Sequence, residues 1–171
     1  MSRAILSAAL ALLAAAGPAL AAPPAAFVSG NWRVDSEFDR MTDKTRCLVK
    51  LEVHQASPTG VFAMLVTPGA VPPYVSVVGK PSILFVTIRV DRNPALSCKG
   101  PEFCNFSPAD SAAIIRELGS ASEVLLQVAT APTIYDFTQD ARGYRECLAK
   151  IREWGFSAPV EQPSRRTAPR S

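Results

Sequence analysis

The stretch that decides the fold is residues 47–54, which read Cys-Leu-Val-Lys-Leu-Glu-Val-His. Cys47, Val49, Leu51 and Val53 occupy alternate positions. The other four positions hold Leu48, Lys50, Glu52 and His54. Successive side chains of a β-strand point to opposite faces of its sheet. The pattern therefore predicts a strand with one face in the core and the other toward solvent.

Similar patterns lie on both sides of this stretch. We expect further strands at residues 31–38, 61–66, 74–78, 83–91, 123–130 and 133–137. The run at residues 61–66 is continuously apolar, which is typical of a strand covered on both faces. Together these segments predict a mainly β protein with two helices, built as an antiparallel β-sandwich or a curled sheet.

Two helices are predicted in the second half of the chain. The first covers residues 107–118, where Ser107 can cap the helix and Pro108 suits its first turn. The second covers residues 141–154 and carries an apolar stripe at helical spacing. Gly155 can take the left-handed conformation that ends many helices. We expect this helix–strand–helix part to pack on the sheet, over an edge or an open face.

The first residues are typical of a cleavable secretory signal peptide. Arg3 supplies a positive charge, residues 4–16 are uncharged and rich in Ala and Leu, and Ala19-Leu20-Ala21 fits the small-x-small cleavage rule. The apolar run is too short for a bilayer span, which needs about 20 residues. We expect cleavage after Ala21 and a periplasmic or secreted protein. The alternative is a retained amphipathic or membrane helix.

The mature chain is predicted to have three parts. These are a flexible leader at residues 22–30, a single β-rich domain at residues 31–156, and a disordered basic, Pro-rich tail at residues 157–171. The net charge of +3 lies mostly in the signal peptide and the tail, so the domain is close to neutral. A nucleic-acid-binding domain would carry a basic stripe of its own, so we expect no nucleic-acid partner.

The tail contains three arginines, Arg165, Arg166 and Arg170. Each basic residue near an anionic surface contributes about 1 kcal/mol at most. Contact of the tail with an anionic surface should therefore be weak, and no membrane span is expected elsewhere in the chain.

Four cysteines follow the signal peptide: Cys47, Cys98, Cys104 and Cys147. An even number in an exported chain suggests two disulfides, and three pairings are open. Cys98 and Cys104 bracket a short loop with a glycine and a proline. Cys47 lies on the inward face of its strand and Cys147 in the apolar stripe of the last helix. We therefore predict Cys98–Cys104 and Cys47–Cys147 bridges. The alternative is that the two inward cysteines are buried thiols.

Few residues are suited to catalysis. His54 is the only histidine, it falls on the outward face of its strand, and no Gly-x-Ser-x-Gly elbow is present. The chain also lacks Cys-x-x-Cys and Gly-rich phosphate-binding motifs, so we expect no metal and no cofactor. Four carboxylates near the first strand could act as acid and base. We favour a solvated, charged turn for this cluster, which consists of Asp35, Glu37, Asp39 and Asp43.

The order of several short motifs resembles one family of exported bacterial proteins. The motifs are Trp-Arg-Val at residues 32–34, Cys47, Ile-Arg-Val-Asp at residues 88–91, Cys98, Cys104, Arg-Glu-Leu-Gly-Ser at residues 116–120, Val-Leu-Leu-Gln-Val at residues 124–128, and Ala-Arg-Gly-Tyr-Arg-Glu-Cys-Leu at residues 141–148. This layout is similar to that of the invasion-associated locus B family. The resemblance spans residues 31–154 and is best from residue 88 onward.

One departure from the family concerns the cysteines. Members usually carry a cysteine in the first strand, where this chain has Asp35 and Ser36, and a small residue in place of Cys147. The resemblance implies an exported, non-enzymatic envelope or secreted domain that binds another envelope or host protein. Given the departure, that partner need not be the family's. The alternative function is a small periplasmic hydrolase that uses the Asp35 to Asp43 carboxylates.

Overall fold

The computed structural model describes residues 26–39, 44–56, 59–70, 72–131 and 133–156. The predicted signal peptide, the tail and Asp43 lie outside the described residues. The strands are β1 (Ala26–Ser29), β2 (Trp32–Asp39), β3 (Lys44–Ala56), β4 (Thr59–Thr67), β5 (Tyr74–Lys80), β6 (Ile83–Val90), β7 (Leu96–Lys99), β8 (Phe103–Asn105), β9 (Glu123–Thr130) and β10 (Ile134–Asp140). The helices are α1 (Pro108–Leu118) and α2 (Arg142–Glu153).

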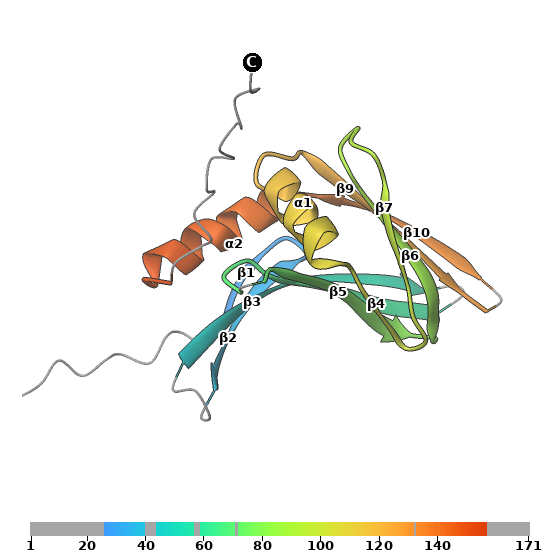
Figure 1. Cartoon of the computed structure of the whole chain (residues 1–171), viewed down its shortest axis with the longest axis horizontal. Helices are drawn as coiled ribbons and strands as arrows, with labels where there is room; N and C mark the ends of the chain where they lie inside the picture. Colours follow the sequence, from blue (N-terminus) through green and yellow to red (C-terminus); the bar gives the residue numbers. More distant parts are fainter. Residues whose placement is uncertain (1–25, 40–43, 57–58, 71, 132, 157–171) are drawn as a thin grey trace, which may run out of the picture.

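The strands form two antiparallel sheets. A six-stranded sheet has the order β1-β2-β3-β4-β5-β8, and a four-stranded sheet has the order β10-β9-β6-β7. In Figure 1 the strands β3, β4 and β5 run beneath the four-stranded sheet, and β2 curls away at the far end. The mainly β, antiparallel fold with two helices is thereby confirmed.

The core lies between the inner faces of the two sheets. Alternate residues of β3 fill it as predicted, with Val49, Leu51 and Val53 almost fully buried. The four-stranded sheet contributes residues of the same kind, such as Ile88 and Leu126. Strand alternation therefore dictates the core, because a buried apolar face fixes the phase of each strand.

Helix α1 closes one opening of the sandwich, against β5 and β6. The Ser107 hydroxyl accepts a hydrogen bond from the Asp110 amide at 3.1 Å, which confirms the predicted cap. The buried Ser111 of this helix links it to the six-stranded sheet and to the segment before the helix. Its hydroxyl accepts a hydrogen bond from the Val75 amide at 3.1 Å and donates one to the Phe106 carbonyl at 3.4 Å.

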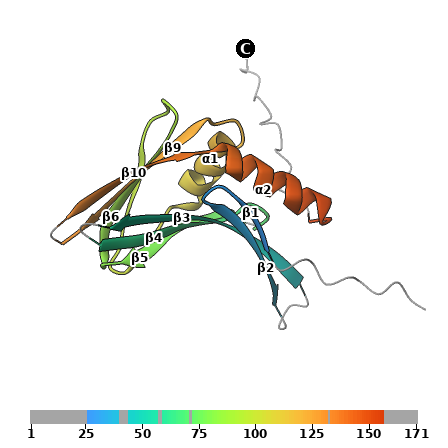
Figure 2. The ribbon, with the colours of Figure 1, turned by 180° about the vertical axis from the view of Figure 1, so that it is seen from behind.

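Helix α2 lies along the hairpin of β1 and β2 (Figure 2). Its start is close to the hairpin turn, because a Cβ added to Gly143 would lie 2.5 Å from both the Ser29 carbonyl and the Trp32 ring. Further along, the Lys150 ammonium is 6.0 Å from the centroid of the Phe27 ring. The helix ends before Gly155, whose φ of +81° is the left-handed conformation expected there.

Strand β1 corrects the predicted leader. Residues 22–30 were expected to be flexible, whereas Ala26–Ser29 pairs with β2 from Ala26 opposite Asp35 to Ser29 opposite Trp32. The physical reason is that Phe27 packs against the core beside α2, so the segment gains an apolar contact as well as a hydrogen-bonded neighbour.

Candidate functional site

The outer face of the six-stranded sheet holds a group of apolar side chains, of which two are exposed. Cross-strand pairing places Ala63, Val78 and Phe103 in one row, and Val61 and Leu65 lie on either side of Ala63 along β4. Val61 is 47% exposed and Phe103 is 52% exposed, whereas Ala63, between them in the sheet, is almost covered. We call this group the apolar face, and it consists of Val61, Ala63, Leu65, Val78 and Phe103.

The apolar face corrects one sequence prediction. The continuous run at residues 61–66 was expected to be covered on both faces, and Val61 departs from this. Phe62, Met64 and Val66 are buried in the core and the outward Ala63 is nearly covered, whereas Val61 points outward and is half exposed. The sequence signal for the site was therefore the apolar run itself, read with the wrong environment at its first residue.

An open depression of about 850 Å³ lies at one end of this face. Its floor is formed largely by Val61, Ala63 and Val78, and its margin carries charged or ionisable residues. Two cross-strand rows cross it. One consists of His54, Val61 and Lys80, and the next of Glu52, Ala63, Val78 and Phe103.

The charges at the margin are not all compensated. The Lys50 ammonium and the Glu52 carboxylate are 2.5 Å apart. The hydrogen bond and charge of Lys50 lower the pKa of Glu52, so this carboxyl group is ionised at neutral pH. His54 and Lys80 are both exposed, and neither forms an ion pair or side-chain hydrogen bond with the residues that the structure describes. The margin therefore has a net positive charge.

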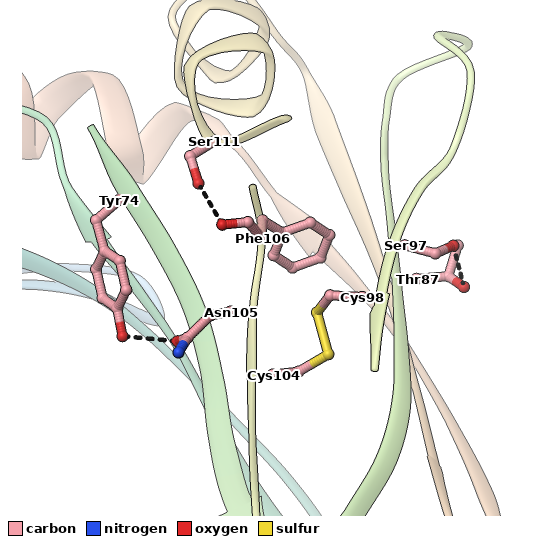
Figure 3. The surroundings of a disulfide bond; sticks show 8 residues. All are labelled: Tyr74, Thr87, Ser97, Cys98, Cys104, Asn105, Phe106 and Ser111. Carbon is pink, nitrogen blue, oxygen red and sulfur yellow. Dashed lines mark hydrogen bonds between the residues drawn. A yellow bond between two sulfur atoms is a disulfide. The ribbon is translucent and has the colours of Figure 1, made fainter. Parts of the chain in front are cut away.

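Polar side chains close the other end of the face. The Tyr74 hydroxyl donates to the Asn105 side-chain oxygen at 2.8 Å (Figure 3). Ser76 lies opposite Asn105 in the pairing of β5 with β8, and it is only 1% exposed. The Ser76 hydroxyl has no hydrogen-bond partner among the described residues. The apolar face thus ends at a polar, covered group and does not continue along β5.

A second depression, of about 450 Å³, lies where the β1–β2 turn meets β10 and α2. Its polar groups satisfy one another: the Ser29 hydroxyl donates to Glu146 at 2.5 Å, and the Asn31 amide donates to Gln139 at 2.6 Å. Arg142 hydrogen-bonds to Asp140 and lowers the pKa of that carboxyl. Because these groups are already paired, we interpret this region as a structural joint.

Asp35 is the one member of the predicted carboxylate cluster whose side chain the structure describes. The Asp35 carboxylate accepts a hydrogen bond from the Arg33 guanidinium at 2.6 Å. The backbone register places Glu37 opposite Arg46 and Asp39 opposite Lys44. Asp35 lines neither of the two depressions described above. Asp35 is therefore paired with a neighbour on its own strand, away from both depressions.

The predicted bridge between Cys98 and Cys104 is present (Figure 3). Its position in the fold was not foreseen, because Cys98 lies in β7 of the four-stranded sheet and Cys104 in β8 of the six-stranded sheet. The sequence indicated a closed local loop. The structure shows that this loop joins the two sheets of the sandwich and positions β8, the strand that carries Phe103.

The second predicted bridge is corrected by the structure. Cys47 and Cys147 are free thiols, half buried and buried respectively, in agreement with the alternative of buried thiols. Both face the core as expected, but α2 lies mainly over β1 and β2 and reaches β3 only marginally. Burial raises the pKa of Cys47, and burial and the charge of Glu146 raise that of Cys147 to about 12. At neutral pH both are therefore unreactive thiols.

We expect the Cys98–Cys104 bridge to stabilise the fold moderately. Replacing both residues by alanine should lower the free energy of unfolding by about 2–3 kcal/mol. The loss is moderate because the closed loop is short, so the bridge removes little conformational entropy from the unfolded chain. Urea unfolding of the double variant and of the native protein measures the difference. Cys47→Ala is the control and should cost less than about 1 kcal/mol. Equal losses for the two variants, or a non-reduced peptide map joining Cys47 to Cys98 or Cys104, would contradict this assignment.

Two further kinds of site, a metal site and a membrane-spanning helix, are absent from the described residues. No group of three or more His, Cys, Asp or Glu side chains among them could hold a metal ion. No helix within the described part of the chain is long and apolar enough to cross a membrane.

Comparisons with known proteins give one informative match. No protein-family model matches the chain, and no curated protein matches it. The fold is similar to the crystal structure of invasion associated protein B from Bartonella henselae, with a TM-score of 0.53 and 15% sequence identity. The match covers 76% of this chain and 96% of that chain. At this identity the likeness shows a shared fold, and the relationship to that protein is a loose structural one.

Proposed function

We propose that this chain is an exported, non-enzymatic domain that binds a protein partner through the apolar face. The observation that carries the proposal is the exposure of Val61 and Phe103 beside a depression of about 850 Å³. Large exposed apolar groups that lie together on a structured sheet are typical of interaction sites. The depression is open, as suits a protein surface more than an enclosed substrate.

Three further features support an extracytoplasmic location. Residues 1–21 fit a signal peptide, with a positive start and a small-x-small end. A disulfide is characteristic of oxidising compartments, and this chain has one that joins its two sheets. The structural neighbour is named as an invasion associated protein. We accordingly propose a periplasmic or secreted protein with one β-rich domain, in which β1 is included, followed by a basic tail.

The proposal can be tested by capturing partners with the mature chain, residues 22–171. We expect the native protein to retain a specific envelope or host protein, and Val61→Glu to weaken its retention at least tenfold, because a charge would be buried without a counter-charge. Quantitative mass spectrometry of the retained fraction, at several bait concentrations, gives the measurement. Unfolding midpoints must show that the variant is folded.

Ile134→Glu is the matched control, since Ile134 is also a strand residue and is 60% exposed, but it lies on the four-stranded sheet. It should leave retention unchanged. A partner held equally by both variants would exclude the apolar face as the binding surface. The absence of any specifically retained protein, from envelope and host extracts alike, would contradict partner binding itself.

A further inference from the structure

We infer that the partner segment seated on the apolar face is an extended peptide with apolar side chains and a carboxylate that lies between His54 and Lys80. This inference rests on the proposed function and specifies the chemistry of the partner. The charged groups at the margin of the depression support it, because the protein itself compensates some of them and not others.

The acidic side chain at the margin, Glu52, is already paired within the protein. Glu52 lies 2.5 Å from the Lys50 ammonium, and Lys50 is the main cause of its lowered pKa. Its negative charge is therefore matched within the protein. A cationic partner segment would have to compete with Lys50 for this carboxylate, and it would also be repelled by Lys80.

Two basic groups line the depression on either side of Val61. His54 and Lys80 occupy the two ends of the row centred on Val61. Adjacent strands lie about 4.8 Å apart, so the two backbones are about 10 Å apart, with side chains on the same face. A carboxylate placed over Val61 is within reach of both side chains. Lysine donates hydrogen bonds with its full charge, and an imidazole can donate in either protonation state.

The open shape of the depression restricts the shape of the partner segment that can bind there. The floor beside this row is Ala63 and Val78, neighbours on adjacent strands, and Phe103 continues the same row at the sheet edge. The surface is open and apolar, so it fits side chains laid across the strands rather than a compact group in a closed pocket. An extended segment with apolar and acidic residues at every second position presents both on the face that contacts the sheet.

Lys80 provides the sharpest test. Lys80→Gln should weaken retention of the captured partner about threefold to tenfold and should reduce its dependence on salt, because one charge contact is lost from the rim of the interface. His54→Gln should have a smaller effect in the same direction. Lys99→Gln is the control, since Lys99 is an exposed lysine on the four-stranded sheet and should change nothing.

A defined probe gives a second measurement that needs no natural partner. The blocked peptide acetyl-Val-Ser-Glu-Ser-Val-amide, whose valines and glutamate share one face when extended, should shift the backbone amide NMR signals of His54, Val61 and Lys80 in the mature protein. The same peptide with lysine in place of glutamate should bind at least threefold more weakly. The Lys80→Gln variant should remove this preference for the acidic peptide.

The outcomes separate the two proposals. If Val61→Glu abolishes retention while Lys80→Gln leaves both its strength and its salt dependence unchanged, the face binds a partner but the carboxylate is wrong. If the two peptides bind equally, or if neither shifts these signals, the acidic segment is also excluded. A dimer in sedimentation that Val61→Glu dissociates would show that a second copy of this chain occupies the face, and it too would overturn the inference.

Discussion

Replacing Trp32 by alanine should lower the free energy of unfolding by about 3–5 kcal/mol, the range typical for removal of a large buried aromatic side chain. Trp32 is 1% exposed, and its indole nitrogen donates to the Asp140 carbonyl at 2.7 Å. Its ring lies 5.4 Å from the Tyr144 ring, centroid to centroid. Gly143 packs against it with no room for a Cβ. The variant loses the contact that seats α2 on the β1–β2 hairpin.

Two milder variants separate the contributions to this joint. Trp32→Phe keeps an aromatic ring but removes the hydrogen bond, so we expect a loss of about 1–3 kcal/mol. Tyr144→Phe removes a buried hydroxyl that has no hydrogen-bond partner among the described residues, so it should cost nothing or stabilise slightly. Chemical denaturation of all three variants measures these differences. A loss below about 1 kcal/mol for Trp32→Ala would show that α2 is not held by this side chain.

The strands with long, regular alternation could be predicted from sequence. β3, β6 and β9 each alternate over most of their length, and their buried residues are those expected, from Val49 in β3 to Val128 in β9. The physical reason is that burial of one face makes a shift of one residue very unfavourable, so the pattern must appear in the sequence.

The short strands could not be predicted in this way. β1, β7 and β8 have only four, four and three residues, too few to show a period. Each exists because a distant neighbour pairs with it, and β7 and β8, close in sequence, join different sheets. Their positions depend on the closure of the sandwich and on the Cys98–Cys104 bridge, neither of which is a local property.

The cysteines show that the orientation of a side chain toward the core is not enough to predict a disulfide pairing. Strand alternation placed Cys47 inward and helical spacing placed Cys147 in the core-facing stripe, and both orientations are correct. A bridge also requires Cα atoms within about 7 Å, and that depends on which strand lies beneath the helix. No sequence pattern predicted that β1 would form, and β1 with β2 makes most of the contact with α2.

The candidate site was visible in the sequence as a pattern but not as a surface. The apolar run of β4 predicted a strand, and His54 was correctly placed on the outward side of β3. Whether the outer side of β4 is covered depends on the presence of a third layer of structure, which no residue of β4 encodes. In the described chain α1 and α2 both pack elsewhere, so Val61 and Phe103 remain exposed.

The phase of β4 can be measured directly, and the candidate site depends on it. Phe62→Ala should lower the free energy of unfolding by about 3–5 kcal/mol. Phe62 is 1% exposed and its ring centroid is 5.0 Å from that of Tyr135 and 6.0 Å from that of Phe137. The ring fits over Gly79, where a Cβ would lie 2.3 Å from it. Alanine would leave a cavity that these rigid neighbours cannot fill.

Val61→Ala is the matched variant one position away. Because Val61 is 47% exposed, it should cost about 1 kcal/mol or less, although it too shortens an apolar side chain of the same strand. Thermal and urea unfolding of the two single variants give the comparison. A large loss at Phe62 with a small one at Val61 is the result expected if residues 62, 64 and 66 face the core. Comparable losses at both positions would mean that the outer side of β4 is also buried, and that the apolar face cannot be a binding surface.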